Sequence, residues 1–210
     1  MRVHDEAHGD VAKDVIEVDL SAVEAFLGRV SDPGQPNATT KASFDPAFRA
    51  IMFTDIVDST SMIARLGDAR SVEMVRAHDA LVRRALKDKS GREVKHTGDG
   101  IMAAFDSAAS AVNCARSIQQ SFGAFNLASK EKLRVRVGLD AGEPVADSND
   151  LFGSTVQMAA RLCPCAEPEM IVVSETVHSL VSDQMALRDL GARALKGFAH
   201  PVRIYEAQWN

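Results

Sequence analysis

The feature that most constrains the fold is a glycine-flanked aspartate between two strand-like runs. In "REVKHTGDGIMAAF", residues 92–105, the turn Gly98-Asp99-Gly100 separates these runs, and glycine permits the positive φ angles of tight hairpins. A hairpin joins antiparallel strands, which disfavours an all-parallel sheet. Strand-like and helix-like segments interleave along the chain, at 49–57, 59–67, 71–89, 106–122, 132–142, 154–163, 169–174, 174–181 and 201–209. The pattern predicts an α+β fold, with helices over a mainly antiparallel sheet.

Two segments indicate which side chains form the core. The helix-like run 71–89 gathers its apolar positions on one side, at Met74, His78, Leu81, Val82 and Ala85. The run 132–142 alternates strictly and turns Leu133, Val135, Val137 and Leu139 to one face. These two faces should pack against each other.

The 210 residues suffice for one domain with a modest extension. Residues 31–46 are rich in Pro, Gly, Ser, Thr and Asn and are typical of a linker. We therefore expect a main domain at 48–210 after an N-terminal extension and linker at 1–47. The beginning of the chain resembles the end of an upstream module, which could be regulatory.

Charge and hydropathy narrow the classes of partner. The net charge is −5 and no basic run is long enough for a nucleic-acid face. No apolar stretch approaches a membrane span or the core of a signal peptide, so we expect a cytoplasmic protein. Cys163 and Cys165 lack further ligands at zinc spacing, and reduced thiols are expected.

Asp55 stands within the apolar run "RAIMFTDIV". An isolated carboxylate at a buried strand end is costly unless a cation or hydrogen bonds compensate it. Asp55 could cap the next helix, but Asp58-Ser59-Thr60 can do this without it. Asp99 could be simple turn chemistry. If the first strand pairs with the hairpin, however, the two carboxylates meet at one end of the sheet, a geometry suited to Mg²⁺ and phosphate oxygens.

The helix that begins near Ser59 adds a second element to this candidate site. Its free N–H groups would point to the same end of the sheet, where an anion such as phosphate is favoured. Metal ions beside a phosphate cradle indicate nucleotidyl or phosphoryl chemistry.

Five ordered motifs resemble the class III nucleotide cyclase catalytic domain, the adenylyl and guanylyl cyclase family. They are "IMFTDIVDST", "EVKHTGDGIMAAF", "LRVRVGLDAG", "DLFGSTVQMAARL" and "LKGFAHPVRIYE", and they span the chain from about Arg49 to its end. The resemblance implies a ferredoxin-like βαββαβ palm. It also implies that Asp55, Asp99 and the Ile56 carbonyl bind two Mg²⁺ or Mn²⁺ ions per active site, with Ser59 and Thr60 beside the substrate phosphates.

The same resemblance assigns a purine pair and a phosphate arginine. Lys95 and Asp150 match the residues that read adenine, although a solvated strand lysine and a turn aspartate are plain alternatives. Arg161 matches the arginine on the phosphates, and Gln157 stands where the family usually has Asn. Both could instead form an exposed polar face. Lys196 matches a position that can touch the triphosphate, but it could also be a surface lysine.

The resemblance thus implies an adenylate cyclase that converts ATP to 3′,5′-cyclic AMP and pyrophosphate, at sites shared across a homodimer. Asp55 and Asp99 would come from one subunit, and Lys95, Asp150, Gln157 and Arg161 from the other. The alternatives are a silent nucleotide-binding regulatory module, and a cyclase for GTP or a pyrimidine nucleotide. The residue Gln157 and the short segment "EPVADSN", where many family members have a longer arm, favour the silent module.

Overall fold

The computed structural model describes residues 48–210, and the predicted extension at 1–47 lies outside them. The strands are β1 (Arg49–Ile56), β2 (Arg92–His96), β3 (Ile101–Phe105), β4 (Val135–Gly142), β5 (Val145–Asp147), β6 (Asp150–Phe152), β7 (Ile171–Ser174), β8 (Arg188–Arg193) and β9 (Val202–Glu206). The helices are α2 (Ser59–Leu66), α3 (Asp68–Asp88), α4 (Ala108–Ala128), α5 (Ser154–Leu162), the 3₁₀ turn η1 (Cys163–Cys165) and α6 (Glu175–Val181).

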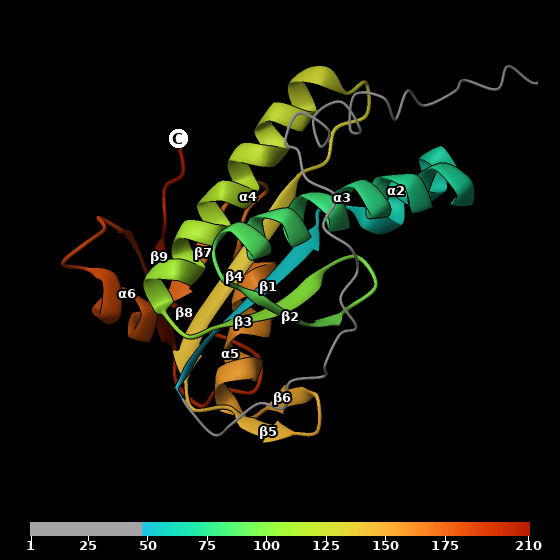
Figure 1. Cartoon of the computed structure of the whole chain (residues 1–210). Coiled ribbons are helices and arrows are strands. Elements are labelled where there is room, and N and C mark those ends of the chain that lie inside the picture. The colour runs from blue at the N-terminus through green and yellow to red at the C-terminus, as the bar shows by residue number, and fades with distance from the viewer. Residues whose placement is uncertain (1–47) are drawn as a thin grey trace, which may run out of the picture.

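One seven-stranded sheet has the order β2-β3-β1-β4-β7-β9-β8 (Figure 1). Each strand pair is antiparallel except β4 with β7, which is parallel. Up to β4 the elements follow a βαββαβ path, and these four strands lie in the order β4-β1-β3-β2. This is the ferredoxin-like arrangement, so the predicted fold class is confirmed.

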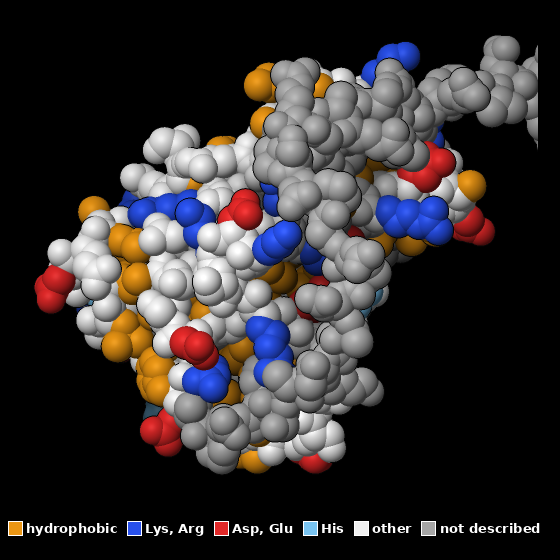
Figure 2. Space-filling model, in the orientation of Figure 1, with side chains coloured by type: hydrophobic (Ala, Val, Ile, Leu, Met, Phe, Trp, Pro, Cys, Tyr) orange, Lys and Arg blue, Asp and Glu red, His pale blue; other side chains and the backbone are white. Residues whose placement is uncertain are grey.

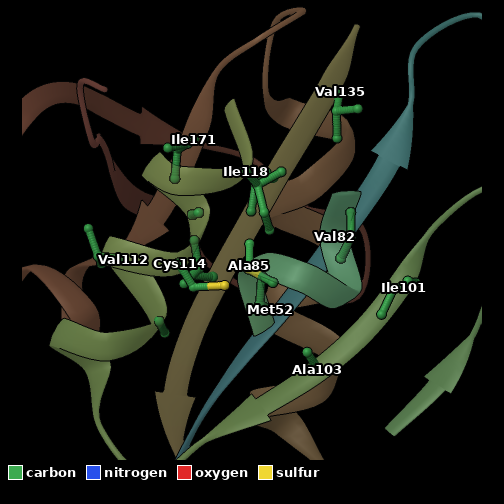
Figure 3. Packing of buried hydrophobic residues seen from close by; sticks show 14 of the residues in the cluster. Met52, Val82, Ala85, Ile101, Ala103, Val112, Cys114, Ile118, Val135 and Ile171 are labelled. Atoms are coloured by element: carbon green, nitrogen blue, oxygen red, sulfur yellow. The ribbon is translucent and has the colours of Figure 1, made fainter. Parts of the chain in front are cut away.

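Helices α3 and α4 cover one face of the sheet and bury the main core (Figures 1 and 3). Met52 from β1, Val82 from α3 and Ile118 from α4 are each fully buried there. The alternating side chains of β4, and Leu133 two residues before it, face the same core, at Leu133, Val135, Val137 and Leu139, as predicted. Burial of such side chains is the main source of stability, at roughly 1.5 to 3 kcal/mol each.

The opposite face of the sheet is covered by α5 and η1. Gly138 on β4 permits this close packing, because a Cβ atom there would lie 2.3 Å from the backbone nitrogen of Cys163. Successive side chains of a strand point to opposite faces. Ile51, Phe53 and Asp55 therefore lie on the α5 side, which explains how a carboxylate fits in a strand that is otherwise apolar.

Two expectations needed adjustment. Helix α4 continues to Ala128, beyond the expected end near Phe122. The edge strand β8 carried no sequence signal, because its side chains are exposed or half-buried on both faces and it pairs with β9 alone.

Cys114, Cys163 and Cys165 are free thiols, as expected. On the face shown in Figure 2, outside the grey atoms, basic and acidic side chains are interspersed. Among the described helices, none has the length and apolar character that crossing a bilayer requires.

Asp140, on β4, gives a prediction about stability. It is 7% exposed, and burial raises its pKa despite hydrogen bonds to Ser174 and the Ala141 backbone. Since the raised pKa belongs to the folded state, the contribution of Asp140 to the free energy of unfolding is most favourable at low pH and is lost as pH rises through that pKa. Asp140→Asn keeps the shape and removes the ionisation. At pH 7 it should raise the free energy of unfolding by on the order of 1 kcal/mol.

Urea unfolding at neutral pH and at about pH 4 checks this prediction, because the gain should shrink near the ordinary pKa of aspartate. A variant that is less stable than the wild type at both pH values would contradict it.

Candidate active site

Two carboxylates meet at the end of β1. Asp55 is the penultimate residue of that strand, and Asp99 lies in the turn between β2 and β3. The Ile56 N–H donates to the Asp99 carbonyl oxygen at 3.1 Å, which ties the turn to the strand. Burial raises the pKa of Asp55; hydrogen bonding and charge from Arg136 oppose this rise, whereas the charge of Asp99 and a hydrogen bond to it add to it. The side chains are thus close enough to perturb each other.

The glycines of the turn allow this approach. Gly98 has φ of 101°, a conformation that residues with side chains rarely adopt. A Cβ atom at Gly100 would lie 1.8 Å from the Thr54 carbonyl oxygen. The turn that carries Asp99 therefore rests directly on the backbone of β1, and only glycine fits at position 100.

Helix α2 begins beside the carboxylates. The Ser59 hydroxyl donates to Asp99 Oδ2 at 2.5 Å. Asp58 is the N-cap residue, with φ of 57°, and its side chain makes no capping hydrogen bond; it lies 3.4 Å from Arg134 instead. The expectation that these side chains cap the helix was therefore wrong. The first N–H groups of α2 keep no intrahelical partner, which favours an anion at this end.

Sequence reasoning missed Arg136 on β4. Asp55 and Arg136 are register partners in the antiparallel β1–β4 pair. The guanidinium donates to Asp55 Oδ2 through Nε and Nη2, both at 2.6 Å. The alternation of apolar residues in 132–142 indicates that Arg136 points away from the core. Its partner, however, follows only from the register of β4 against β1.

Lys95 and Asp150 lie together in one chain. Lys95 Nζ is 2.6 Å from Asp150 Oδ2, although β2 and β6 are far apart in sequence. The ammonium also lies 5.5 Å from the centre of the Phe152 ring. Both side chains are partly exposed, at 40% and 31%. The site therefore offers an adjacent donor and acceptor at its surface.

The remaining candidates are solvent-exposed. Gln157 and Arg161 project from α5, one helical turn apart. Thr60 on α2 and Lys196, between β8 and β9, are also exposed. Within residues 48–210, no side-chain hydrogen bond or ion pair joins these four residues to Asp55 or Asp99.

The donor set fits a hard divalent cation. The described part of the chain has no group of three or more His, Cys, Asp or Glu side chains suited to a metal. Mg²⁺ typically takes one or two carboxylates and completes its shell with water and substrate phosphates. Asp55, Asp99 and the Ile56 carbonyl match that pattern. Burial is the main cause of the raised pKa of Asp55, and the nearby charge of Asp99 adds to it.

Comparisons with known proteins identify the family of the chain. The crystal structure of an adenylate/guanylate cyclase/hydrolase from Silicibacter pomeroyi has 31% sequence identity and a TM-score of 0.69, over 78% of this chain and 97% of that one. The Mycobacterium tuberculosis protein Rv2212 is 32% identical over 160 residues, which are 76% of this chain and 41% of that protein. An adenylate cyclase of Glutamicibacter nicotianae is 27% identical over 165 residues, or 77% and 39%.

The chain spans less than half the length of these two curated relatives. Residues 45–207 match the family described as the adenylate and guanylate cyclase catalytic domain. This match covers most of the chain and includes every element of the seven-stranded sheet. The chain therefore belongs to the adenylate and guanylate cyclase catalytic domain family.

Proposed function

We propose that this protein is an adenylate cyclase, which converts ATP to 3′,5′-cyclic AMP and pyrophosphate. The observation that carries the proposal is the meeting of Asp55 and Asp99 at the start of α2, beside Arg136. In this reaction the ribose 3′-oxygen bonds to the α-phosphorus while the bond from that phosphorus to the leaving pyrophosphate breaks. The chain has to position the triphosphate and balance its charge.

Asp55, Asp99 and the Ile56 carbonyl would hold two Mg²⁺ or Mn²⁺ ions. Ions bound there would lower the pKa of the 3′-hydroxyl and neutralise phosphate charge. Arg136 forms an ion pair with Asp55 in the structure. A guanidinium released from this contact has the planar donor fork that suits phosphate oxygens. Arg136 would then bind the triphosphate.

The start of α2 supports a phosphate site at the same place. Ser59 and Thr60 occupy the first turn, where the backbone N–H groups have no intrahelical acceptor. Such a helix terminus binds anions through those N–H groups and the helix dipole. It would hold the end of the triphosphate distal to the ribose, while Lys196 could contribute charge from the β8–β9 connection.

The Lys95–Asp150 contact supports ATP as the nucleotide. Lys95 would donate to a ring nitrogen of adenine and Asp150 would accept from its exocyclic amine. Guanine in the same orientation presents a ring N–H to the lysine and a carbonyl oxygen to the carboxylate. Both contacts would be lost, and a site built to hydrogen-bond its substrate rejects an analogue that leaves those groups unpaired.

The exposed α5 side chains support an active site shared between two subunits. Gln157 and Arg161 face solvent in the single chain, although they match residues that act on ribose and phosphates. In a symmetric dimer they could reach the carboxylates of the partner subunit. Gln157 keeps the amide of the usual Asn with one more methylene, so it would orient the ribose less tightly.

A direct assay tests the proposal. Purified protein with Mn²⁺ and ATP, GTP, CTP or UTP should give 3′,5′-cyclic AMP and pyrophosphate in excess over the other cyclic products. A dominant cyclic GMP or pyrimidine product would reassign the substrate. Nucleotide binding without any cyclic product would favour the silent regulatory module instead.

Mixing two inactive variants tests the shared site. Asp55→Ala and Arg161→Ala should each be inactive, because every site lacks one essential side chain. A mixed dimer assembles one intact site, so an equal mixture should regain about a quarter of wild-type activity if the subunits exchange freely. Continued silence, with mixed dimers confirmed by differential tags, would contradict the shared site.

A further inference from the structure

A hydrogen-bond network connects α3 to the turn that carries Asp99. Asp79, on α3, accepts from two histidine rings: His78 Nδ1 lies 3.0 Å and His96 Nε2 3.1 Å from its Oδ1. The other nitrogen of His96, Nδ1, accepts the Gly98 N–H at 3.1 Å. The backbone immediately before Asp99 is thereby linked through His96 to a helix of the main core.

The same network reaches the other side of the turn. His78 Nε2 lies 3.4 Å from the Thr54 hydroxyl, which accepts the Ile101 N–H at 3.0 Å. Gly98 precedes Asp99 by one residue and Ile101 follows it by two. The backbone amides that flank Asp99 on both sides are therefore held by one connected set of side chains.

The hydrogen-bond partners of His96 determine which of its two ring nitrogens carries the proton. A backbone N–H can only donate, so His96 Nδ1 carries no proton when it accepts from Gly98. His96 Nε2 then carries the proton and donates to the Asp79 carboxylate. This assignment leaves no donor facing a donor.

The α3 end of the network is rigid. His78 is fully buried and Thr54 is 2% exposed. The His78 ring stacks on Phe122 of α4, with centroids 5.6 Å apart. Burial raises the pKa of Asp79, but the hydrogen bond from His78 and the charge of Arg83 are among the causes that lower it overall, so Asp79 stays ionised. The network therefore fixes the turn against the core.

We propose that His96 is a positioning residue, which together with Asp79, His78 and Thr54 holds the Asp99 carboxylate in the orientation that a divalent cation requires. This inference rests on the proposed function and deepens it. His96 needs to touch neither metal nor nucleotide, because it acts through the Gly98 amide. Removal of such outer partners typically costs metal affinity while the ligands themselves stay in place.

Two conservative variants test the two nitrogens of the His96 ring separately. His96→Asn keeps an acceptor near the Nδ1 position, because an asparagine side chain can accept from the backbone N–H two residues on. His96→Gln keeps a donor near Nε2 and loses the Gly98 contact. We expect His96→Gln to raise the Mn²⁺ concentration for half-maximal activity about 10- to 100-fold, because the Gly98 amide loses its acceptor. His96→Asn keeps that acceptor but loses the Asp79 contact, so its rise should be clearly smaller but measurable.

Glu206→Gln is the matched control. It weakens the ion pair of Arg188 with Glu206, which joins β8 to β9 at the sheet edge opposite β2, and should leave the Mn²⁺ dependence unchanged. Unchanged Mn²⁺ dependence in His96→Gln, or an equal loss in His96→Asn, would overturn the inference.

Amide hydrogen exchange of the full chain gives a readout independent of turnover. Exchange at Gly98 should accelerate about three- to tenfold in His96→Gln and stay slow in His96→Asn. Titration with Mn²⁺ in the presence of 3′-deoxy-ATP, which lacks the attacking hydroxyl, should rank the variants in the same order. If the wild type gives no cyclic product but this order holds, the proposed function fails and the positioning role stands. If the wild type forms cyclic AMP but Gly98 exchanges at the wild-type rate in His96→Gln, the positioning role fails and the proposed function stands.

Discussion

Replacement of Asp55 by asparagine should reduce the rate of cyclic AMP formation by at least about a thousandfold, because several kcal/mol of charge stabilisation at the metal site is lost. The amide has nearly the same shape as the carboxylate but carries no negative charge. Its partner Arg136 is also left without an opposite charge in the free site. Initial rates at saturating Mn²⁺ and ATP measure the effect.

The fold should survive this substitution. Burial already disfavours the ionised form of Asp55, so a neutral side chain removes a desolvation cost while it loses an ion pair. We expect the urea midpoint to change little. Asp106→Asn is the matched control, because Asp106 is 90% exposed and pairs with Arg49 away from the site. An Asp55→Asn protein that keeps a tenth of wild-type activity would remove these carboxylates from the mechanism.

Replacement of Gly100 by alanine should have the largest effect on structure. The added Cβ would lie 1.8 Å from the Thr54 carbonyl oxygen. The oxygen is a backbone atom, and the Cβ is bonded directly to the backbone. Neither can move aside as a flexible side chain would. The β2–β3 turn must shift, which should cost about 3 kcal/mol or more and carry Asp99 away from Asp55. Urea unfolding and cyclase assays measure the two losses.

Gly67→Ala provides the comparison. Gly67 has φ of 76° and ψ of 168°, and a Cβ atom added there would meet no other atom within 4 Å, so this variant incurs conformational strain alone, about 1 to 3 kcal/mol. It lies between α2 and α3, and the site geometry should remain. If Gly100→Ala were no less stable and no less active than Gly67→Ala, the close approach of the turn to β1 would not matter.

Local patterns in the sequence were sufficient for most of the secondary structure. Side-chain alternation located β4 and its core face, and helical periodicity located α3, because these signals depend on the geometry of a single element. The Gly-Asp-Gly turn predicted the β2–β3 hairpin for the same reason. Strand β8 was not predicted, because the side chains of this edge strand are exposed or half-buried on both faces and so show no buried–exposed alternation.

The site depended on relations between elements. The chain shows two carboxylates and their place at the end of a strand and in a turn. Their approach, however, requires β1 to pair with β3, and the partnership of Asp55 with Arg136 requires one register of β1 against β4. A shift of one residue would turn Arg136 to the other face. Side-chain periodicity disfavours such one-residue shifts, but it cannot choose between registers that differ by two residues, because these keep the same faces.

The sequence by itself determined most of the elements, their buried faces and the chemical types available for a site, since each follows from the order of residues within a short segment. Tertiary structure alone decided which charges meet. It paired Lys95 with Asp150 across distant strands and linked His78, Asp79 and His96 around the Asp99 turn. Contacts between segments far apart in the chain are set by packing of the whole sheet and its helices, and no local pattern encodes that packing.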